Sequence, residues 1–174
     1  MPCGDFIRLS HLRTPAEPGP VSQRVGTVPS VDLFDTRTVS RTAMADGAAV
    51  WDLLSIPVNW PRWAPQMSRV TTDDDRPAGA RVSRGEQLHI HTIIPGISLP
   101  VTITDVEEPV RWDMMASVPL GRIDVGHRLN VEGAMTTVTV TMRWDGVPLL
   151  GALVLQSYRP LAGVALNRLL KLAG

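Results

Sequence analysis

The chain has 174 residues and a hydrophobic content of 44%, which is enough for one domain with a substantial buried core. Seventeen basic residues balance seventeen acidic ones, so no net charge favours binding to nucleic acid or to an anionic membrane surface. Cys3 is the single cysteine, which excludes an internal disulfide and any metal site built from several cysteines.

The first residues, MPCGDFIRLSHLRTP, show no secretory signal, and the longest apolar stretch, PLLGALVL at 148–155, is too short to cross a bilayer. We therefore expect a cytoplasmic protein without a membrane span. Residues 1–33 contain few large apolar side chains and five prolines: Pro2, Pro15, Pro18, Pro20 and Pro29. This composition predicts a flexible N-terminal arm ahead of a folded domain over 34–174. The alternative is an ordered arm that docks on the body, on a second subunit, or as a lid over a cavity.

The folded domain is expected to begin with a strand followed by two short helices. Residues 36–43, TRTVSRTA, are rich in β-branched side chains, which predicts a strand. Asp46 stands at the position of a helix N-cap before GAAVWDLLS, whose apolar residues are spaced for one helical face. Pro57 and Pro61 then end this helix or restart it as a short second one.

Six strands and one long helix are predicted for the rest of the chain. From about residue 67 to 145 the sequence alternates with period two, broken by the turn signals RPAG, PG, EEP, PLG and EGA. Residues 147–173 return to a helical period, with an apolar face of Val154, Tyr158, Leu161, Ala165, Leu169 and Leu172. Pro160 inside this segment predicts either a kink over a cavity mouth or two helical pieces that follow the curvature of the sheet. A curved sheet wrapped around one helix leaves a pocket wherever that helix fails to fill the concave face.

Several segments in this order resemble a known superfamily. TVSRTAMADGAAVWDLLS followed by NWPRWAP resembles the opening of START-like proteins, in particular the polyketide cyclase/dehydratase-like group of the SRPBCC superfamily. ITDVEEPVRWDM and GHRLNVEGAMTTVTVTMRWDG resemble their later strands before the long C-terminal helix. The resemblance covers residues 36–173.

This resemblance implies an α+β helix-grip fold. A curved antiparallel sheet of about seven strands would wrap around the C-terminal helix, with two short helices after the first strand and a deep apolar cavity between sheet and helix. Members of the superfamily include aromatase/cyclases as well as lipid and hormone carriers, so the resemblance implies no single activity.

Strand parity predicts which side chains face the cavity, because alternate residues of a strand share one face. The expected inward sets are Val110, Trp112, Met114, Ala116 and Val118 in VRWDMMASV, Val138, Val140, Met142 and Trp144 in VTVTMRW, and Val125, Leu129 and Val131 in VGHRLNV. His127 shares the face of the last set. A lone histidine on an apolar face is either a core residue with a hydrogen-bond partner or a candidate acid–base group.

The strand RVSRGEQLHIHTII is the expected source of a partner for His127. If Leu88 and Ile90 face inward, Glu86 and Arg84 share their side. A carboxylate and a guanidinium in an apolar wall must pair or hydrogen-bond, because an isolated buried charge is too costly.

A bulge at Gly85 would change this register. It would turn Arg84 outward and leave Glu86 in place, or bring Gln87, His89 and His91 inward instead. The HIH triplet has the alternation of a metal motif, but the sequence offers no third ligand nearby. We therefore expect solvent-facing histidines, no metal and no other cofactor.

The candidate catalytic residues follow from a cyclase/dehydratase mechanism. His127 would be the acid–base group, and Glu86 would orient it or act itself. Arg84 would stabilise a developing enolate, and Tyr158 would donate a hydrogen bond to a substrate oxygen. The ligand-binding wall is predicted to comprise Trp51, Trp60, Trp63, Leu88, Ile90, Trp112, Met114, Leu129, Met142, Trp144, Val154 and Leu161. The tryptophan-rich loop would roof one end of the cavity.

Three functions compete at this level. We expect a polyketide cyclase/dehydratase-like protein that holds a hydrophobic small molecule and promotes cyclisation or dehydration by acid–base catalysis. The alternative is a non-catalytic carrier that sequesters a lipid or an aromatic ligand in the same cavity. A third hypothesis is an interaction module whose Trp/Pro loop contacts a partner or a second copy in a homodimer. Ionisable groups with shifted pKa values beside free space would favour an enzyme, and a filled cavity would favour the interaction module.

Overall fold

The structure, a computed structural model, describes residues 36–72, 77 and 79–174. Its elements in chain order are β1 (Thr36–Met44), α1 (Gly47–Ser55), the 3-10 turn η1 (Pro57–Asn59), α2 (Trp60–Trp63), β2 (Met67–Thr72), β3 (Gln87–Thr92), β4 (Ser98–Glu107), β5 (Arg111–Val118), β6 (Gly121–Glu132), β7 (Met135–Gly146) and α3 (Pro148–Ala173). The predicted arm over residues 1–33 lies outside the described residues.

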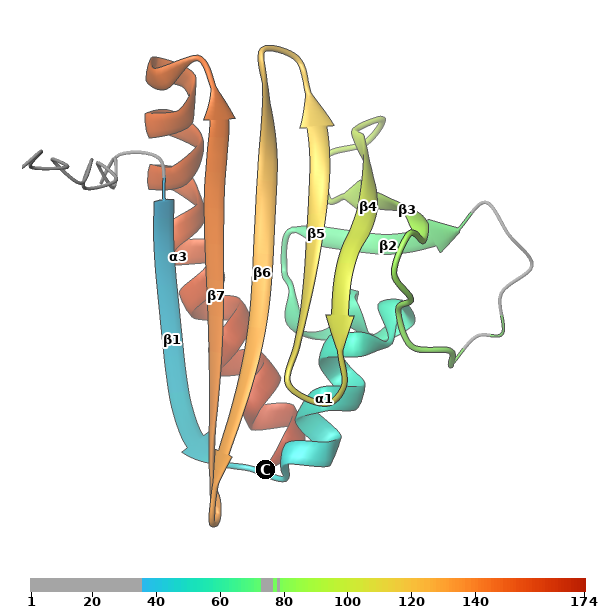
Figure 1. The fold of residues 1–174 in the computed structure, drawn as a ribbon, viewed down its shortest axis with the longest axis vertical. Coiled ribbons are helices and arrows are strands. Elements are labelled where there is room, and N and C mark those ends of the chain that lie inside the picture. The colour runs from blue at the N-terminus through green and yellow to red at the C-terminus, as the bar shows by residue number, and fades with distance from the viewer. Residues whose placement is uncertain (1–35, 73–76, 78) are drawn as a thin grey trace, which may run out of the picture. The chain divides into compact units, whose positions relative to one another are not determined.

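One seven-stranded antiparallel sheet in the order β1-β7-β6-β5-β4-β3-β2 forms the body of the domain. Figure 1 shows β1, β7, β6 and β5 standing upright while β2 lies across them, so the sheet is strongly curled. The long helix α3 runs along one face of the sheet and ends beside α1. The predicted curved sheet around a long C-terminal helix is confirmed.

The two short helices begin and end where the sequence predicts. The Asp46 side chain caps α1 by accepting a hydrogen bond from the Ala48 backbone N–H at 3.1 Å. Pro57 starts the turn η1, and Pro61 lies in the first turn of α2, where a missing N–H costs nothing. The chain therefore turns sharply below the sheet before it enters β2.

Alternation along the strands sorts apolar side chains from polar ones as predicted. In β7 the residues Val138, Val140, Met142 and Trp144 are buried, and the threonines between them are partly exposed. On the outer face the hydroxyl groups of β1 and β7 form three cross-strand hydrogen bonds of 2.8–3.1 Å, in the pairs Thr38–Thr141, Ser40–Thr139 and Thr42–Thr137. The expected inward positions of Val110 and Val131 are wrong: Val110 lies in the turn before β5, Val131 lies near the end of β6, and both are exposed.

The buried face of α3 differs from the predicted stripe at two positions. Leu161 is 40% exposed and Leu172 is 46% exposed. A step of three residues turns an α-helix by about 300°, which is about 60° short of a full turn. Positions 161 and 172 therefore lie about 60° around the helix axis from Tyr158 and Leu169, toward solvent. The buried side consists of Gly151, Leu155, Ala162, Gly163, Ala165, Leu166, Leu169 and Leu170. Pro160 lies inside this single helix, and the predicted division into two helical pieces is not seen.

By length and composition alone, α3 could cross a membrane. The core helix of a soluble protein can meet the same criterion, and α3 contributes Leu155, Leu166 and Leu169 to the core beneath the sheet. Exposed leucines Leu149 and Leu153 lie on its first turns. The helix therefore combines a buried face with an apolar exposed start.

Contact between α3 and β7 should depend on Gly151. A Cβ at this position would fall 2.7 Å from Cγ of Trp144, a buried ring that cannot move aside without repacking. We expect Gly151→Ala to lower the free energy of unfolding by about 1–3 kcal/mol through overpacking, measured by urea denaturation. The control is Gly163→Ala on the same helix, whose Cβ would meet the flexible end of Arg41 at 3.0 Å. Gly163→Ala should leave stability unchanged or raise it by up to about 1 kcal/mol, so equal stability of the two variants would contradict the prediction.

Candidate functional site

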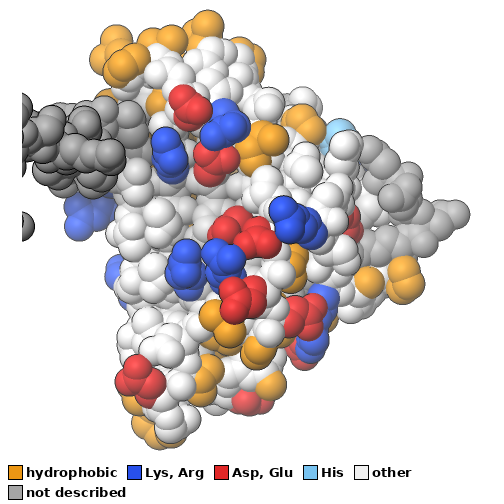
Figure 2. Space-filling view, in the orientation of Figure 1, with side chains coloured by type: hydrophobic (Ala, Val, Ile, Leu, Met, Phe, Trp, Pro, Cys, Tyr) orange, Lys and Arg blue, Asp and Glu red, His pale blue; other side chains and the backbone are white. Residues whose placement is uncertain are grey.

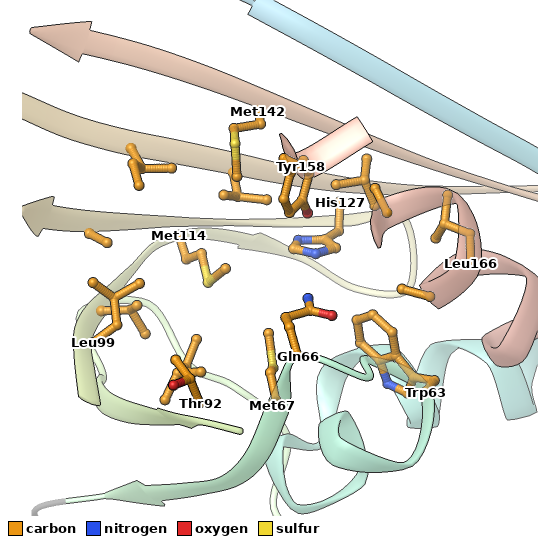
Figure 3. Close-up of a pocket in the computed structure, with 18 residues that line it drawn as sticks. Trp63, Gln66, Met67, Thr92, Leu99, Met114, His127, Met142, Tyr158 and Leu166 are labelled. Carbon is orange, nitrogen blue, oxygen red and sulfur yellow. The ribbon is translucent and has the colours of Figure 1, made fainter. Parts of the chain in front are cut away.

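A cavity of about 190 Å³ lies between the concave face of the sheet and α3. Figure 3 shows its lining side chains, which come from α2, α3, the strands β2 to β7 and the loop before β2. They are Trp63, Gln66, Met67, Ile90, Thr92, Leu99, Val101, Met114, Ala116, Ile123, Val125, His127, Val140, Met142, Tyr158, Ala162, Ala165 and Leu166. None of these side chains carries a formal charge at neutral pH apart from any charge on His127.

His127 is held in the cavity wall by aromatic stacking. Its side chain is buried on the inner face of β6, directly opposite Trp112 of β5. The imidazole stacks on the Trp112 ring with centroids 3.9 Å apart and planes 13° from parallel. Trp112 in turn stacks on Trp60, with ring centroids 5.0 Å apart and an angle of 6° between the ring planes. The three rings form one continuous stack, which fixes the plane of the imidazole.

Burial keeps the imidazole neutral. Desolvation by burial lowers the pKa of His127 to about 3. A weaker interaction with the Trp112 backbone acts to raise this pKa and offsets the effect of burial only in part. The Nδ1 atom of the ring has no hydrogen-bond partner among the described residues. His127 is therefore a neutral ring at physiological pH, with one polar atom that is not satisfied by the protein.

Two further polar side chains reach the cavity from other elements. Gln66 precedes β2, and its Oε1 atom is buried with no hydrogen-bond partner from residues 36–72, 77 and 79–174. Tyr158 enters from α3, and burial raises the pKa of its phenol to about 12. Figure 3 shows Gln66 pointing toward His127 across the cavity. The polar part of the site is thus made of an amide, an imidazole and a phenol, all uncharged.

The tryptophan-rich segment closes one end of this site. Trp63 lines the cavity, whereas Trp51 and Trp60 are buried in the core outside its lining. The Trp60 and Trp63 indole N–H groups donate hydrogen bonds to the carbonyl oxygens of Leu54 at 2.7 Å and of Leu53 at 2.8 Å. These bonds fasten α2 to the last turn of α1 and so position the Trp63 ring.

Six of the predicted site residues line the cavity: His127, Tyr158, Trp63, Ile90, Met114 and Met142. Eight others lie outside its lining, six of them buried in the core, with Val154 half-buried and Leu161 exposed: Trp51, Trp60, Leu88, Trp112, Leu129, Trp144, Val154 and Leu161. Alternation along the strands predicted the correct face of the sheet. Residues toward the ends of that face, however, pack against α1 and α3 and do not border the cavity.

The expected placement of Arg84 and Glu86 in the cavity wall is corrected. Gly85 has a backbone φ of +85°, which turns the chain before β3 starts at Gln87. Arg84 is exposed, and the Glu86 carboxylate accepts a hydrogen bond from the Ser83 backbone N–H at 2.8 Å. Neither residue belongs to the cavity lining, so the structure follows the bulge alternative for Arg84 and places Glu86 in a turn.

The two histidines of the HIH triplet lie on the other face of the sheet. His89 and His91 alternate with the buried Leu88 and Ile90, and the His91 ring contacts the Thr71 hydroxyl at 3.0 Å. Within residues 36–72, 77 and 79–174, no group of three or more histidine, cysteine, aspartate or glutamate side chains could hold a metal ion. The predicted solvent-side location of these histidines agrees with the structure.

Sequence reasoning missed Gln66 and Ala162, and it placed Ala165 on the apolar face of α3 without assigning it to the site. Gln66 lies in the loop between Pro65 and β2, where no periodicity assigns a face. Ala162 and Ala165 lie on the buried side of α3, and their short side chains leave the space that the cavity occupies. Small residues on the inner face of the long helix were the available signal for the position of the cavity.

Comparison with known proteins identifies the family. Residues 36–171 match the family described as "Polyketide cyclase / dehydrase and lipid transport", and the chain belongs to this family. No curated protein sequence matches the chain.

Solved structures share the fold at low sequence identity. A hypothetical protein from Helicobacter pylori, jhp0584, superposes with a TM-score of 0.69 and 11% identity over 95% of this chain and 100% of its own. A START superfamily protein from Mycobacterium smegmatis gives a TM-score of 0.56 and 17% identity over 79% of this chain and 92% of its own. DynU16, a "putative protein in the dynemicin biosynthetic locus", gives a TM-score of 0.59 and 18% identity over 79% of this chain and 46% of its own. The START-like fold is thereby confirmed.

The lowered pKa of His127 predicts a pH dependence of stability. Between pH 6.5 and 3 the unfolded chain binds a proton at this histidine and the folded chain does not, so the free energy of unfolding should fall as the pH is lowered through this range. The contribution is at most about 1.4 kcal/mol per pH unit. His127→Phe should reduce the slope, measured by urea denaturation between pH 4.5 and 7.5. His91→Phe, on the other face of the sheet, is the matched control, and equal slopes in wild type and His127→Phe would contradict the prediction.

Proposed function

We propose that this protein binds a small, neutral and largely apolar molecule in the cavity beneath α3, as a carrier or sequestering protein. One observation supports the proposal above all others: the site is largely apolar, with no Asp, Glu, Lys or Arg side chain among the described residues that line it. A charged ligand would lose its hydration there without gaining a partner. Polyketide-derived ring compounds and simple lipids fall within the class that the site accepts.

The cavity volume limits the size of this ligand. A buried apolar cavity of about 150 Å³ accepts benzene, so about 190 Å³ suits a ligand of one or two rings. Met67, Met114 and Met142 project into the space, and their flexible thioether chains adapt to ligands of different shape. Larger ring systems would require these side chains or the start of α3 to move.

Both titratable groups of the cavity have shifted pKa values, which was the expected mark of an enzyme, but the direction of each shift favours binding over acid–base catalysis. A general base works best with a pKa near the pH of the reaction, whereas the pKa of His127 is about 3. The phenol of Tyr158, with a pKa of about 12, stays protonated. Glu86 and Arg84, which were expected to assist, lie outside the cavity lining. We therefore place transport or storage of the ligand ahead of proton abstraction.

Cyclisation or dehydration is the second candidate function, and two observations favour it. The family description names cyclase and dehydrase activity, and DynU16 belongs to a biosynthetic locus. In this site the reaction would depend on a folded ligand pose, on exclusion of water, and on hydrogen bonds from neutral His127 and Tyr158 that polarise a carbonyl oxygen. We propose a cytoplasmic location for either function, and a homodimer stays a prediction.

Filling the cavity should abolish ligand binding. Ala162→Phe places a ring in the cavity lining, so we expect at least a tenfold loss of affinity for 2-naphthol in a titration followed by quenching of tryptophan fluorescence, to which Trp63 contributes from the wall. Ala152→Phe puts the same ring on the exposed side of α3 and is the control. Saturable binding of equal strength in both variants would show that the ligand binds elsewhere.

A test of turnover separates the two candidates. If the protein is a cyclase, single-turnover assays with short poly-β-ketone substrates should show product, with a rate that stays flat between pH 5 and 9 because both titratable groups are neutral there. Tyr158→Phe should then reduce the rate by tenfold or more while changing ligand affinity less. Product formation at the uncatalysed rate, together with tight binding, would leave the carrier function.

A further inference from the structure

Two buried polar atoms of residues that line the cavity have no hydrogen-bond partner within the described part of the chain. They are Nδ1 of His127 on β6 and Oε1 of Gln66 in the loop before β2. Buried polar groups are nearly always paired, so each unpaired atom in a native fold calls for a reason. Both residues line the same cavity, so a polar group of a bound molecule would give both atoms a partner.

The two side chains differ in how far they can adjust. The His127 ring is held by its stack on Trp112, so the direction of its ring nitrogens is fixed. Gln66 ends in an amide whose last torsion has a broad energy profile, so the amide can turn its oxygen or its nitrogen into the cavity. Figure 3 shows the amide facing the imidazole from the opposite wall, beside open space.

We propose that His127 and Gln66 form a polar anchor for a hydroxyl group at one end of an otherwise apolar ligand. This inference rests on the proposed function and specifies its ligand class: neutral hydroxylated compounds such as phenols and alcohols. A hydroxyl donates one hydrogen bond and accepts others, so it can pair with both side chains unless both present acceptors, and a turn of the Gln66 amide that presents its N–H removes that case. The rest of the ligand lies among Met67, Met114 and Leu99.

The lack of arginine and lysine among the described lining residues argues against a carboxylate as the anchored group. A carboxylate could accept from the Gln66 amide and the Tyr158 phenol, but the lining supplies no arginine or lysine to offset its lost hydration. An unsubstituted hydrocarbon would fit the walls but would leave both polar atoms unpaired. A neutral hydroxyl offers hydrogen bonds to the two polar atoms and brings no uncompensated charge into the cavity.

Three probes of the same two-ring shape test the anchor: naphthalene, 2-naphthol and 2-naphthoate, titrated at pH 7.5 by fluorescence quenching and by calorimetry. One net hydrogen bond corresponds to roughly three- to tenfold in affinity, so the full-length protein should bind 2-naphthol tighter than naphthalene by that ratio. 2-Naphthoate should bind more weakly than both. In Gln66→Met, which keeps the size of the side chain, the ratio should fall toward one. Gln87→Met, at an exposed position of β3, should keep the wild-type ratio.

The outcomes distinguish this inference from the proposed function. Equal affinity of naphthalene and 2-naphthol in the wild type, or an unchanged ratio in Gln66→Met, would overturn the anchor and leave the apolar binding site intact. The tightest binding by 2-naphthoate would overturn the neutral ligand class. Binding by none of the three would overturn the proposed function together with the anchor. The wild-type series decides the question even if Gln66→Met does not fold.

Discussion

A curled sheet of seven strands has a single long helix to cover its concave face, and the side chains of that helix determine where the core stays open. Near the start and the end of α3, Leu155 and Leu169 are fully buried and complete the packing. Between them the helix turns Ala162 and Ala165 inward, and the sheet is too curved for such short side chains to reach it. The cavity therefore lies opposite the middle of α3, and it exists because this stretch of helix is under-filled.

The convex face of the sheet carries the charges that the cavity lacks. Figure 2 shows Lys, Arg, Asp and Glu side chains interspersed over the centre of this face. Arg111 pairs with Asp105 at 2.7 Å and with Glu107 at 2.9 Å, and Arg122 pairs with Asp124 at 3.2 Å. Exposed ion pairs of this kind contribute little to stability, but they keep opposite charges together on the solvent side. Strict alternation along β5 and β6 thus separates a charged surface from a neutral interior.

Most of the fold could be predicted from the sequence, but only part of the candidate site could. Period-two alternation placed His127, Met114 and Met142 on the inner face, because one buried face fixes the register of a strand. The position of Arg84 could not be read this way, because a glycine with positive φ resets the alternation just before β3. Gln66 lies in a loop, where only the three-dimensional path of the chain decides which way a side chain points. Even so, the three clustered tryptophans did indicate the end of the cavity that Trp63 closes.

One physical cause acts on both titratable groups of the cavity and moves them in opposite directions. Desolvation lowers the pKa of His127 to about 3 and raises that of Tyr158 to about 12, because in each case it penalises the charged form. The two residues consequently stay neutral over about the same wide pH range, and each can only donate or accept a hydrogen bond. A site of this kind recognises a ligand by its shape and by a neutral polar group. Chemistry that moves a proton to His127 or from Tyr158 would create a charge in this apolar site, and the same desolvation opposes it.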